Sequence, residues 1–291
     1  MGLRLKFNLV MLLVAALGLT GIGFVASQML ARNARANILQ QAGLMMEGAM
    51  AIRSYTVNQI GPLIGSQMTH KFLPQSVPAY AATQNINGLR KRYPNFTYKE
   101  ATLNPTNPNA RATGWETSII DYFRNHTNEK QLVGEHTTAT GRSLYMARPI
   151  KVKSEACLSC HGNVADAPKT MLAKYGKANG FDWHMNEIVG SQIVNVPMEV
   201  ALDRAHKTLV TFMYSVGAVF ALIMLILNLL LNQIVINPVK RMAGIAHEIS
   251  MGKLDVEECT ARGKDEISVL AESFNRMRRS LVNAMQMLNS K

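Results

Sequence analysis

Two long runs of apolar residues dominate the pattern of the chain. Phe7 to Leu30 contains no charged residue and would span about 36 Å as a helix, enough to cross a bilayer core. A second uncharged run, Leu209 to Ile236, is longer. Each run is predicted to be a transmembrane helix. The alternatives are a cleaved signal peptide for the first run, which is long for that purpose, and a buried core helix for the second.

Basic residues next to the two runs predict their orientation. Arg4 and Lys6 precede the first run, and Lys240 and Arg241 follow the second. The chain is therefore predicted to lie in a bacterial inner membrane, and the positive-inside rule places both termini in the cytoplasm and the intervening domain in the periplasm. Basic residues also flank the outer ends of the runs, but a long loop translocates largely regardless of its own charge. The predicted parts are 1–31 (flank and first span), 32–207 (periplasmic domain), 208–236 (second span) and 237–291 (cytoplasmic tail).

The periplasmic domain has a mixed pattern that predicts an α+β fold. Ala34 to about Leu73 has helical spacing, and Pro62 is the point at which this helix would kink or end. The segments expected after it are a strand at Phe96–Ala101, a loop at Leu103–Asn109, a helix at Trp115–Asn125, strands at Gln131–His136 and Ser143–Val152 joined by the turn at 137–141, and a last strand at Asn186–Met198. A long helix followed by a small sheet has the outline of a PAS-like sensor domain.

The cytoplasmic tail carries apolar residues at helical steps. Met242, Ile245 and Ile249 come first, and a Gly-x-Leu break follows at 252–254. The pattern then resumes with alternating steps of three and four at Ile267, Leu270, Phe274, Met277, Leu281, Ala284 and Leu288. One chain cannot bury such a heptad seam, so the tail predicts a coiled-coil homodimer. The alternative is an amphipathic helix on the membrane surface, helped by the arginines at 276, 278 and 279.

This tail resembles the HAMP linker of bacterial transmembrane receptors. The matching residues are Pro238 after the span, the Gly252-x-Leu254 connector, Asp265-Glu266-Ile267 and the LAESFNRM that follows. The resemblance covers residues 237–288 and implies a parallel four-helix bundle of two chains that passes signals from the membrane to an output domain. The chain ends at Lys291 with no kinase, cyclase or methyl-accepting module, so the expected receiver is a separate cytoplasmic protein.

The central chemical motif is the sequence ACLSCHG, from Ala156 to Gly162. Cys-x-x-Cys-His is the attachment signature for c-type haem. Two thiols one helical turn apart can bond the two vinyl groups of one haem, and the next imidazole can ligate the iron. Cys157 and Cys160 are therefore the predicted thioether residues of a single covalent haem c, and His161 is the predicted proximal ligand. Covalent attachment occurs outside the cytoplasmic membrane, which agrees with the independent prediction of topology.

Three other uses of paired cysteines compete with the haem interpretation. A redox dithiol would be expected in a parallel βαβ pattern, which is not found. A zinc site would need further ligands at recognisable spacing, and none accompanies the motif. A disulfide across two residues is strained and does not account for His161. Cys259, on the cytoplasmic side, is interpreted as a plain thiol.

The ligand on the opposite, distal face of the iron is left open by the sequence. The first candidates are Tyr55, Met50, Met46 and His70. A wider set adds Met45, His126, His136, Met146 and His184. Methionine would favour electron transfer at higher potential, whereas a second histidine or an open site would favour slower electron carriage or gas sensing. Each methionine is also explained by core packing.

The periplasmic domain resembles the Tll0287-like (DUF3365) family of haem-c proteins over residues 35–200. The segments that carry the resemblance are AIRSYTVNQIGPLI (51–64), LNPTNPNARATGWE (103–116), GRSLYMARPI (141–150), CLSCHG and NEIVGSQIVNVPM. The resemblance implies a PAS-like fold with one covalent haem, proposed in the family to sense redox state or a ligand. Family members can ligate iron through a cysteine on the N-terminal helix, which this chain lacks, and Tyr55 is the nearest positional match. A neighbouring methionine or an open site is the alternative.

Composition and charge add little to this picture. The net charge of +12 is a poor guide to partners, because basic residues also flank membrane spans. Basic and aromatic residues are not interleaved as in a nucleic-acid-binding surface, so nucleic acid is not an expected partner. No acid–base pair for catalysis is identifiable, so an enzyme is not expected. Two functions remain: a redox or ligand sensor that signals through the tail, or an anchored electron-transfer or accessory subunit of a respiratory or photosynthetic complex.

Overall fold

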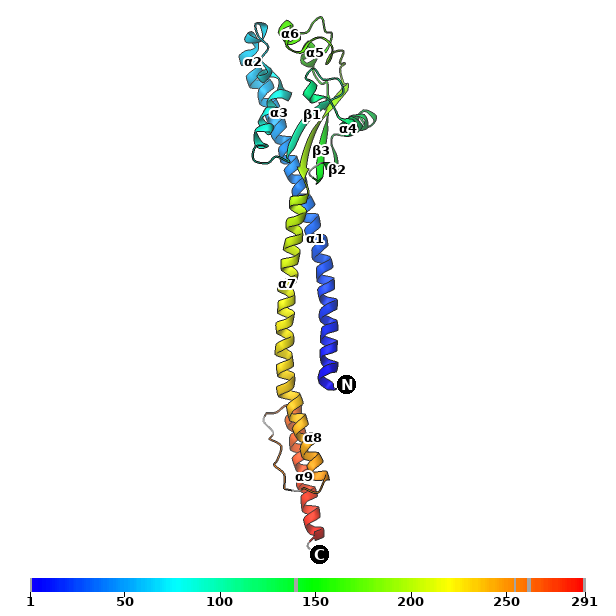
Figure 1. Ribbon diagram of the computed structural model, residues 1–291, viewed down its shortest axis with the longest axis vertical. Helices are drawn as coiled ribbons and strands as arrows, with labels where there is room; N and C mark the ends of the chain where they lie inside the picture. Colours follow the sequence, from blue (N-terminus) through cyan, green and yellow to red (C-terminus); the bar gives the residue numbers. More distant parts are fainter. Residues whose placement is uncertain (1, 139–140, 254, 261–262, 290–291) are drawn as a thin grey trace. The chain divides into compact units, whose positions relative to one another are not determined.

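The structure is a computed structural model that describes residues 2–138, 141–253, 255–260 and 263–289. The chain divides into two units, which we call the span–linker unit (Met1–Ala26 with Leu209–Lys291) and the sheet unit (Ser27–Thr208). The elements of Figure 1, with η for 3-10 and π helices, are α1 (Leu3–Tyr55), η1 (Thr56–Ile60), α2 (Gly61–Ile64), η2 (Gly65–Thr69), η3 (Pro74–Ser76), α3 (Pro78–Leu89), β1 (Thr97–Thr102), η4 (Pro108–Ala110), α4 (Gly114–Asn125), β2 (Leu132–Thr138), β3 (Gly141–Lys151), α5 (Glu155–His161), α6 (Lys169–Tyr175), β4 (Ile188–Pro197), α7 (Glu199–Leu230), η5 (Leu231–Ile236), α8 (Asn237–Ser250) and α9 (Glu266–Asn289).

The first apolar run lies within α1, and the second continues from α7 into η5. By length and composition, these are the two helices among the described residues that could cross a membrane, each with a window of mean hydropathy 2.5. Almost none of the residues in those windows are buried within the chain. The two helices touch within the span–linker unit, where the positions of Gly18 and Gly23 lie against the side chains of Phe220 and Met213.

A π-turn precedes a proline at two places in the chain. Gly61 N–H donates to the carbonyl of Thr56 in η1, and Asn237 N–H donates to that of Asn232 in η5. In each case the next residue is a proline, which has no N–H and whose ring clashes with the carbonyl four residues earlier in a regular helix. Widening the turn by one residue accommodates this clash. The helix expected from Ala34 to about Leu73 therefore ends its regular α portion at Tyr55.

The sheet unit is built on a four-stranded antiparallel sheet of order β1-β4-β3-β2. Its register pairs Tyr98 of β1 and Met146 of β3 with the same residue of β4, Val194. Helices α1 and α3 cover one face, and α4 covers the other. This is a mixed helix and antiparallel-sheet architecture, as the strand pattern predicts.

Helix α1 packs on the sheet through residues at helical spacing. Ile38, Ala42, Met46 and Ala49 are almost fully buried against residues of β1, β3 and β4. On the opposite face, α4 begins with a capping box in which Glu116 accepts from the Thr113 N–H at 2.7 Å. Glu116 also accepts from Lys99 of β1 at 2.7 Å, so the cap ties α4 to the sheet.

In the span–linker unit, α8 and α9 run side by side in the same direction, joined by a connector that returns along them (Figure 1). Met242, Cys259 and Ala271 form its buried core. The Asn275 side chain accepts from the Cys259 N–H at 2.9 Å and donates to the Cys259 carbonyl at 2.8 Å, which holds the connector on α9.

Most of the predicted seam of α9 is open in the single chain. Leu270, Met277 and Leu281 are exposed, whereas Ile267 and Phe274 are half-buried against the linker core. The side chain of Leu288, together with Leu254 of the expected connector and residues 139–140 of the expected turn, lies outside the described residues.

Candidate functional site

The two cysteines of the CxxCH motif lie one turn apart on α5. The helix begins at the N-cap Ser154, whose hydroxyl accepts from the Ala156 N–H at 3.2 Å. Positions three apart in a helix are neighbours on its surface, so Cys157 and Cys160 present their thiols on one side. Both are free, with Cys157 exposed and Cys160 partly covered. Such a pair can bond one planar group lying along that side of the helix.

His161, at the end of α5, is held by contacts from two other segments. Its Nδ1 lies 2.7 Å from the carbonyl oxygen of Gly180 and 3.5 Å from the hydroxyl of Thr106. The ring stacks on Trp183, with centroids 4.1 Å apart and planes 12° apart. A carbonyl only accepts, so Nδ1 must carry the hydrogen, and the lone pair is then on Nε2.

The protonation of His161 favours metal binding through Nε2. Burial lowers the pKa of the imidazole, and the hydrogen bond to Gly180 opposes part of that change. The ring is therefore neutral near pH 7, as a metal ligand must be. Among the described residues, no hydrogen bond to Nε2 is found. A carbonyl acceptor on the far nitrogen is the usual way in which a protein fixes a ligating histidine.

The loop before β4 reaches His161 because of its backbone geometry. Gly180 has φ +86°, and a Cβ there would lie 2.0 Å from the Thr106 hydroxyl. Asp182 N–H donates to the Gly162 carbonyl at 2.9 Å, and Trp183 N–H donates to the His161 carbonyl at 3.1 Å. These bonds fasten the loop to the end of α5 and place the indole on the imidazole. Sequence reasoning missed Gly180, Trp183 and Thr106 as parts of the site.

A small apolar cluster packs against α5. It contains Phe72, Ala167, Met171 and Phe181, and Cys160 packs against it. The hydroxyl of Thr170, in α6, donates to the carbonyl of Met68, in η2, at 2.8 Å. The segment that follows α1 is thereby joined to the helices beside the motif.

The four first candidates for the distal ligand occupy different environments. Met46 is fully buried in the core between α1 and the sheet. The Met50 sulfur lies 3.3 Å from the side-chain nitrogen of Gln192. Tyr55 ends α1 and is half exposed, and His70 caps η2 and is exposed. In the part of the chain that the structure describes, no hydrogen bond, ion pair or ring contact joins any of these side chains to His161.

The residues of the wider set have other partners among the described residues. Met146 is buried in the sheet core, and Met45 packs at the edge of that core. His136 stacks on Trp115, His126 stacks on Tyr122, and His184 lies 3.7 Å from Glu187. Within the described ranges, no three His, Cys, Asp or Glu side chains gather that could hold a metal ion by themselves. A metal at His161 would therefore need most of its ligands from a bound group.

A buried polar network joins the last turns of α1 to the sheet. Arg53 pairs with Glu100 of β1, which also accepts from the hydroxyl of Tyr98 at 2.8 Å. Burial, followed in size by the charge of Glu100, raises the pKa of Tyr98 well above its usual range. The network fixes the rotation of the last turns of α1, which carry Met50 and Tyr55, just before the π-turn begins at Thr56.

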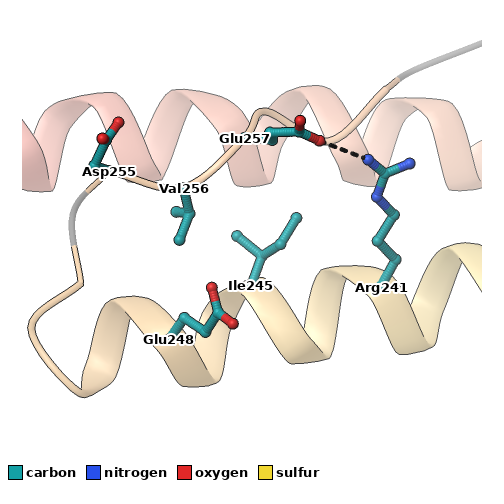
Figure 2. Close-up of a pocket in the computed structure, with 6 residues that line it drawn as sticks. All are labelled: Arg241, Ile245, Glu248, Asp255, Val256 and Glu257. Carbon is teal, nitrogen blue, oxygen red and sulfur yellow. Dashed lines mark hydrogen bonds and ion pairs between the residues drawn. The ribbon is translucent and has the colours of Figure 1, made fainter.

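The linker contains an open pocket between α8 and the connector, shown in Figure 2. Its lining residues are Arg241, Ile245, Glu248, Asp255, Val256 and Glu257. Arg241 spans it to pair with Glu257 at 3.1 Å. Further along, Arg278 of α9 pairs with Glu258 at 3.0 Å. Ion pairs on both sides thus hold the connector between the two helices.

Comparison with known proteins gives two family matches and one similar structure. The Tll0287-like family model matches residues 31–197, and the HAMP domain model matches residues 230–283. No curated protein matches the sequence. A solved structure described as that of the cyanobacterial heme-protein Tll0287 is similar at 16% identity and a TM-score of 0.43, covering 55% of this chain and 94% of that one.

Proposed function

The chain belongs to the Tll0287-like family and continues into a HAMP domain, and from this premise we infer that it is a membrane-anchored c-type haem sensor. The observation that carries the inference is a histidine poised for ligation, directly after two thiols on one side of a short helix. Membership of the family supports haem as the group that these residues hold.

In this proposal Cys157 and Cys160 carry the two thioether bonds of one haem c, and His161 is the proximal ligand. The haem supplies an iron that can change its charge by one electron or bind a small ligand. The chain supplies orientation: the Gly180 carbonyl fixes the tautomer of His161, and Trp183 limits rotation of its ring. The apolar cluster around Phe72 and Met171 keeps water from one side of α5.

We place the distal ligand on α1 or on the turns after it, with Tyr55, Met50, Met46 and His70 as the candidates. Met50 and Tyr55 are accessible at the end of α1, where the Arg53–Glu100 pair fixes the rotation of the helix. Met46 would have to leave a packed core, which disfavours it. A ligand in this place would link the iron to the helix that enters the first span.

The proposed topology has four parts with both termini in the cytoplasm. Residues 1–31 and 208–236 form the spans, 32–207 form a PAS-like periplasmic haem domain, and 237–291 form the HAMP domain. The two long helices with unburied apolar windows support this arrangement. A location in the bacterial inner membrane agrees with the proposed covalent haem, because such haem is attached outside the cytoplasm.

Signal transfer is proposed to run through a homodimer of the HAMP domain to a separate cytoplasmic protein. Leu270, Met277 and Leu281 are exposed in one chain, and a second copy would bury them. Adding or removing charge at a buried group changes local forces strongly at low dielectric. A bundle with two packings could turn that local event into a change that a partner reads. This role is non-enzymatic.

The haem assignment is tested by covalent attachment. We expect Cys157→Ala with Cys160→Ala to abolish haem staining on a denaturing gel, and Cys259→Ala to retain it. Haem that remains covalently bound in the double variant would refute the assignment.

The sensor role is tested by cross-linking α9 in the two oxidation states. In a Cys259→Ser background, Leu281→Cys lies on the seam and Asn283→Cys lies off it. We expect the rate of bismaleimide cross-linking between the two chains to differ between oxidised and reduced protein at residue 281 and not at residue 283. Equal rates at residue 281 would refute redox signalling through the linker.

The second candidate is an electron-transfer or accessory subunit of a respiratory or photosynthetic complex. The observation that favours it is the exposure of α5, which has no buried residue, so an edge of the haem would be open to a donor. Rapid electron exchange with a soluble cytochrome, together with a reduced form insensitive to CO, would favour this role over sensing.

A further inference from the structure

The turn after α3 carries three basic residues between two exposed apolar ones. We call residues 89–93 (Leu89, Arg90, Lys91, Arg92 and Tyr93) the basic turn. Its backbone is ordered by N–H groups of residues 92 and 93, which donate to the Leu89 carbonyl at 3.0 and 2.9 Å. Leu89 is 53% exposed and Tyr93 is 54% exposed. The three basic side chains are exposed, and within the described chain they have no hydrogen bond or ion pair. The ring of Tyr93 lies edge-on to Phe96, with centroids 5.8 Å apart, but neither core packing nor internal pairing explains the three basic residues.

Strand register places the basic turn at one end of the sheet unit. The turn leads into β1, whose first residue, Thr97, pairs with Asn195 near the end of β4. Two residues after Asn195, β4 ends at Pro197, and α7 begins at Glu199. Ile38 of α1 packs in the same cluster as Met198. The basic turn therefore lies at the end of the sheet unit where α1 enters and α7 leaves (Figure 1).

The lengths of chain to the predicted spans bring this end close to the membrane. The first apolar run ends at Leu30, about 12 Å of helix before Ile38, and the second begins at Leu209, about 15 Å of helix after Glu199. The polar headgroup region of a bilayer adds several ångströms on each side of its hydrocarbon core. A side chain at this end of the unit is thus within reach of lipid headgroups.

We propose that the basic turn docks on the outer leaflet of the membrane in which the chain is anchored. The basic side chains of Arg90, Lys91 and Arg92 would bind the phosphates of anionic lipids. The ring of Tyr93 and the methyl groups of Leu89 would enter the interfacial layer. Basic side chains attract anionic headgroups, and tyrosine is suited to the interface because one end is apolar and the other is polar. The inference rests on the membrane anchoring in the proposed function.

Acidic residues at the same end do not cancel this attraction. Glu135 pairs with Arg35 at 3.4 Å, and Asp203 pairs with Lys207 at 2.7 Å. Glu199 lies against the backbone of Gly141. The charges of the basic turn are thus left for a partner outside the chain. Docking would fix the height and tilt of the domain above the bilayer.

The test uses the full chain in lipid nanodiscs containing brominated lipids. Tyr93→Trp adds an indole at the basic turn, and Tyr80→Trp is the matched control at the other end of α3. Tyr80 lies near Tyr175, which belongs to the cluster beside the CxxCH motif. The emission of the native tryptophans is subtracted with the wild-type chain. An interfacial ring sits ~5–10 Å into the boundary between headgroups and acyl chains, so we expect bromines to quench about half or more of the added emission at 93 and little at 80.

The lipid charge and the basic residues are varied together. The triple substitution Arg90→Gln, Lys91→Gln and Arg92→Gln is added to the Tyr93→Trp chain. In anionic phosphatidylglycerol discs it should lower bromine quenching at residue 93 to the level that the Tyr93→Trp chain shows in neutral phosphatidylcholine discs. Protein that inserts but shows equal quenching at both positions would overturn the docking and leave the proposed function standing. Quenching at 93 that is independent of lipid charge would overturn phosphate binding. Failure of the chain to insert into discs would overturn both the docking and the anchoring.

Discussion

The substitution Asn275→Ala should release the connector of the HAMP domain from α9. The Asn275 side chain is buried and satisfies both the N–H and the carbonyl of Cys259, at 2.9 and 2.8 Å. Alanine leaves these two backbone groups buried without partners. Each such group costs about 1–3 kcal/mol, so we expect the closed connector to lose about 2–6 kcal/mol relative to the open one.

The thiol of Cys259 reports this opening directly. Its side chain is only 6% exposed, so alkylation requires the connector to move, and the rate follows the open population when reclosing is fast. Every 1.4 kcal/mol is a factor of ten, so the rate should rise between roughly 30-fold and about 20,000-fold. Mass spectrometry of the peptide containing Cys259 separates this thiol from the cysteines of α5.

Asn283→Ala is the matched control, because Asn283 is an exposed asparagine on the same helix. Both substitutions remove the same side chain and raise helix propensity alike. An alkylation rate in Asn275→Ala no higher than in Asn283→Ala would show that the two hydrogen bonds do not hold the connector.

Three other predictions concern separate parts of the molecule. Trp183→Leu should shift the haem midpoint potential and the electron paramagnetic resonance spectrum by freeing the ring of His161, whereas Trp115→Leu, which breaks a similar stack on another histidine, should leave both unchanged. Burial and the neighbouring carboxylate raise the pKa of Tyr98 in the folded chain, so with rising pH this tyrosine ionises first in the unfolded chain. The free energy of unfolding should therefore fall above about pH 10, and it should fall less steeply in Tyr98→Phe. Chemical denaturation at a series of pH values measures both. Hydrogen bonds from Ser268 lower the pKa of Asp265 at the start of α9. Asp265→Ala, or acid below about pH 4 in the wild type, should therefore lower the protection factors of the amides in the first turn of that helix, measured against the intrinsic exchange rates at the same pH.

Elements with a strong alternating or heptad pattern were predictable to within a few residues. Strands β1 and β3 and helix α4 lie where the sequence indicates, because each buries one side of a regular pattern. Helix α3 is different: it buries only Ala82 and Ile86 among polar residues, so its apolar stripe is too thin to signal a helix. The π-turns also escaped prediction, because Pro62 indicates that a regular helix is disturbed and does not indicate how the backbone adapts.

The site was predictable only where it is local in sequence. Cys157, Cys160 and His161 fall within one helix, and their spacing carries the chemistry. The partners of the imidazole do not: Gly180 is 19 residues away along the chain, and Thr106 is 55 residues away. Their contact depends on the loop geometry before β4, which no short motif encodes. The distal ligand proposed on α1 would be harder still to predict, because it would depend on tertiary packing between residues about a hundred positions apart.

The π-turn at Leu231–Ile236 also sets the angular phase between α7 and α8. Its hydrogen bonds reach back five residues, so the turn holds one residue more than a regular α-helix would. Each residue of an α-helix advances by about 100°, and each residue of a π-turn advances by less, so deleting the extra residue here would leave the apolar side of α8 nearly in phase. A deletion elsewhere in α7 would rotate that side by about 100°. A chimera that replaces this turn with regular α-helix will therefore stay in phase only if it has one residue fewer at the junction.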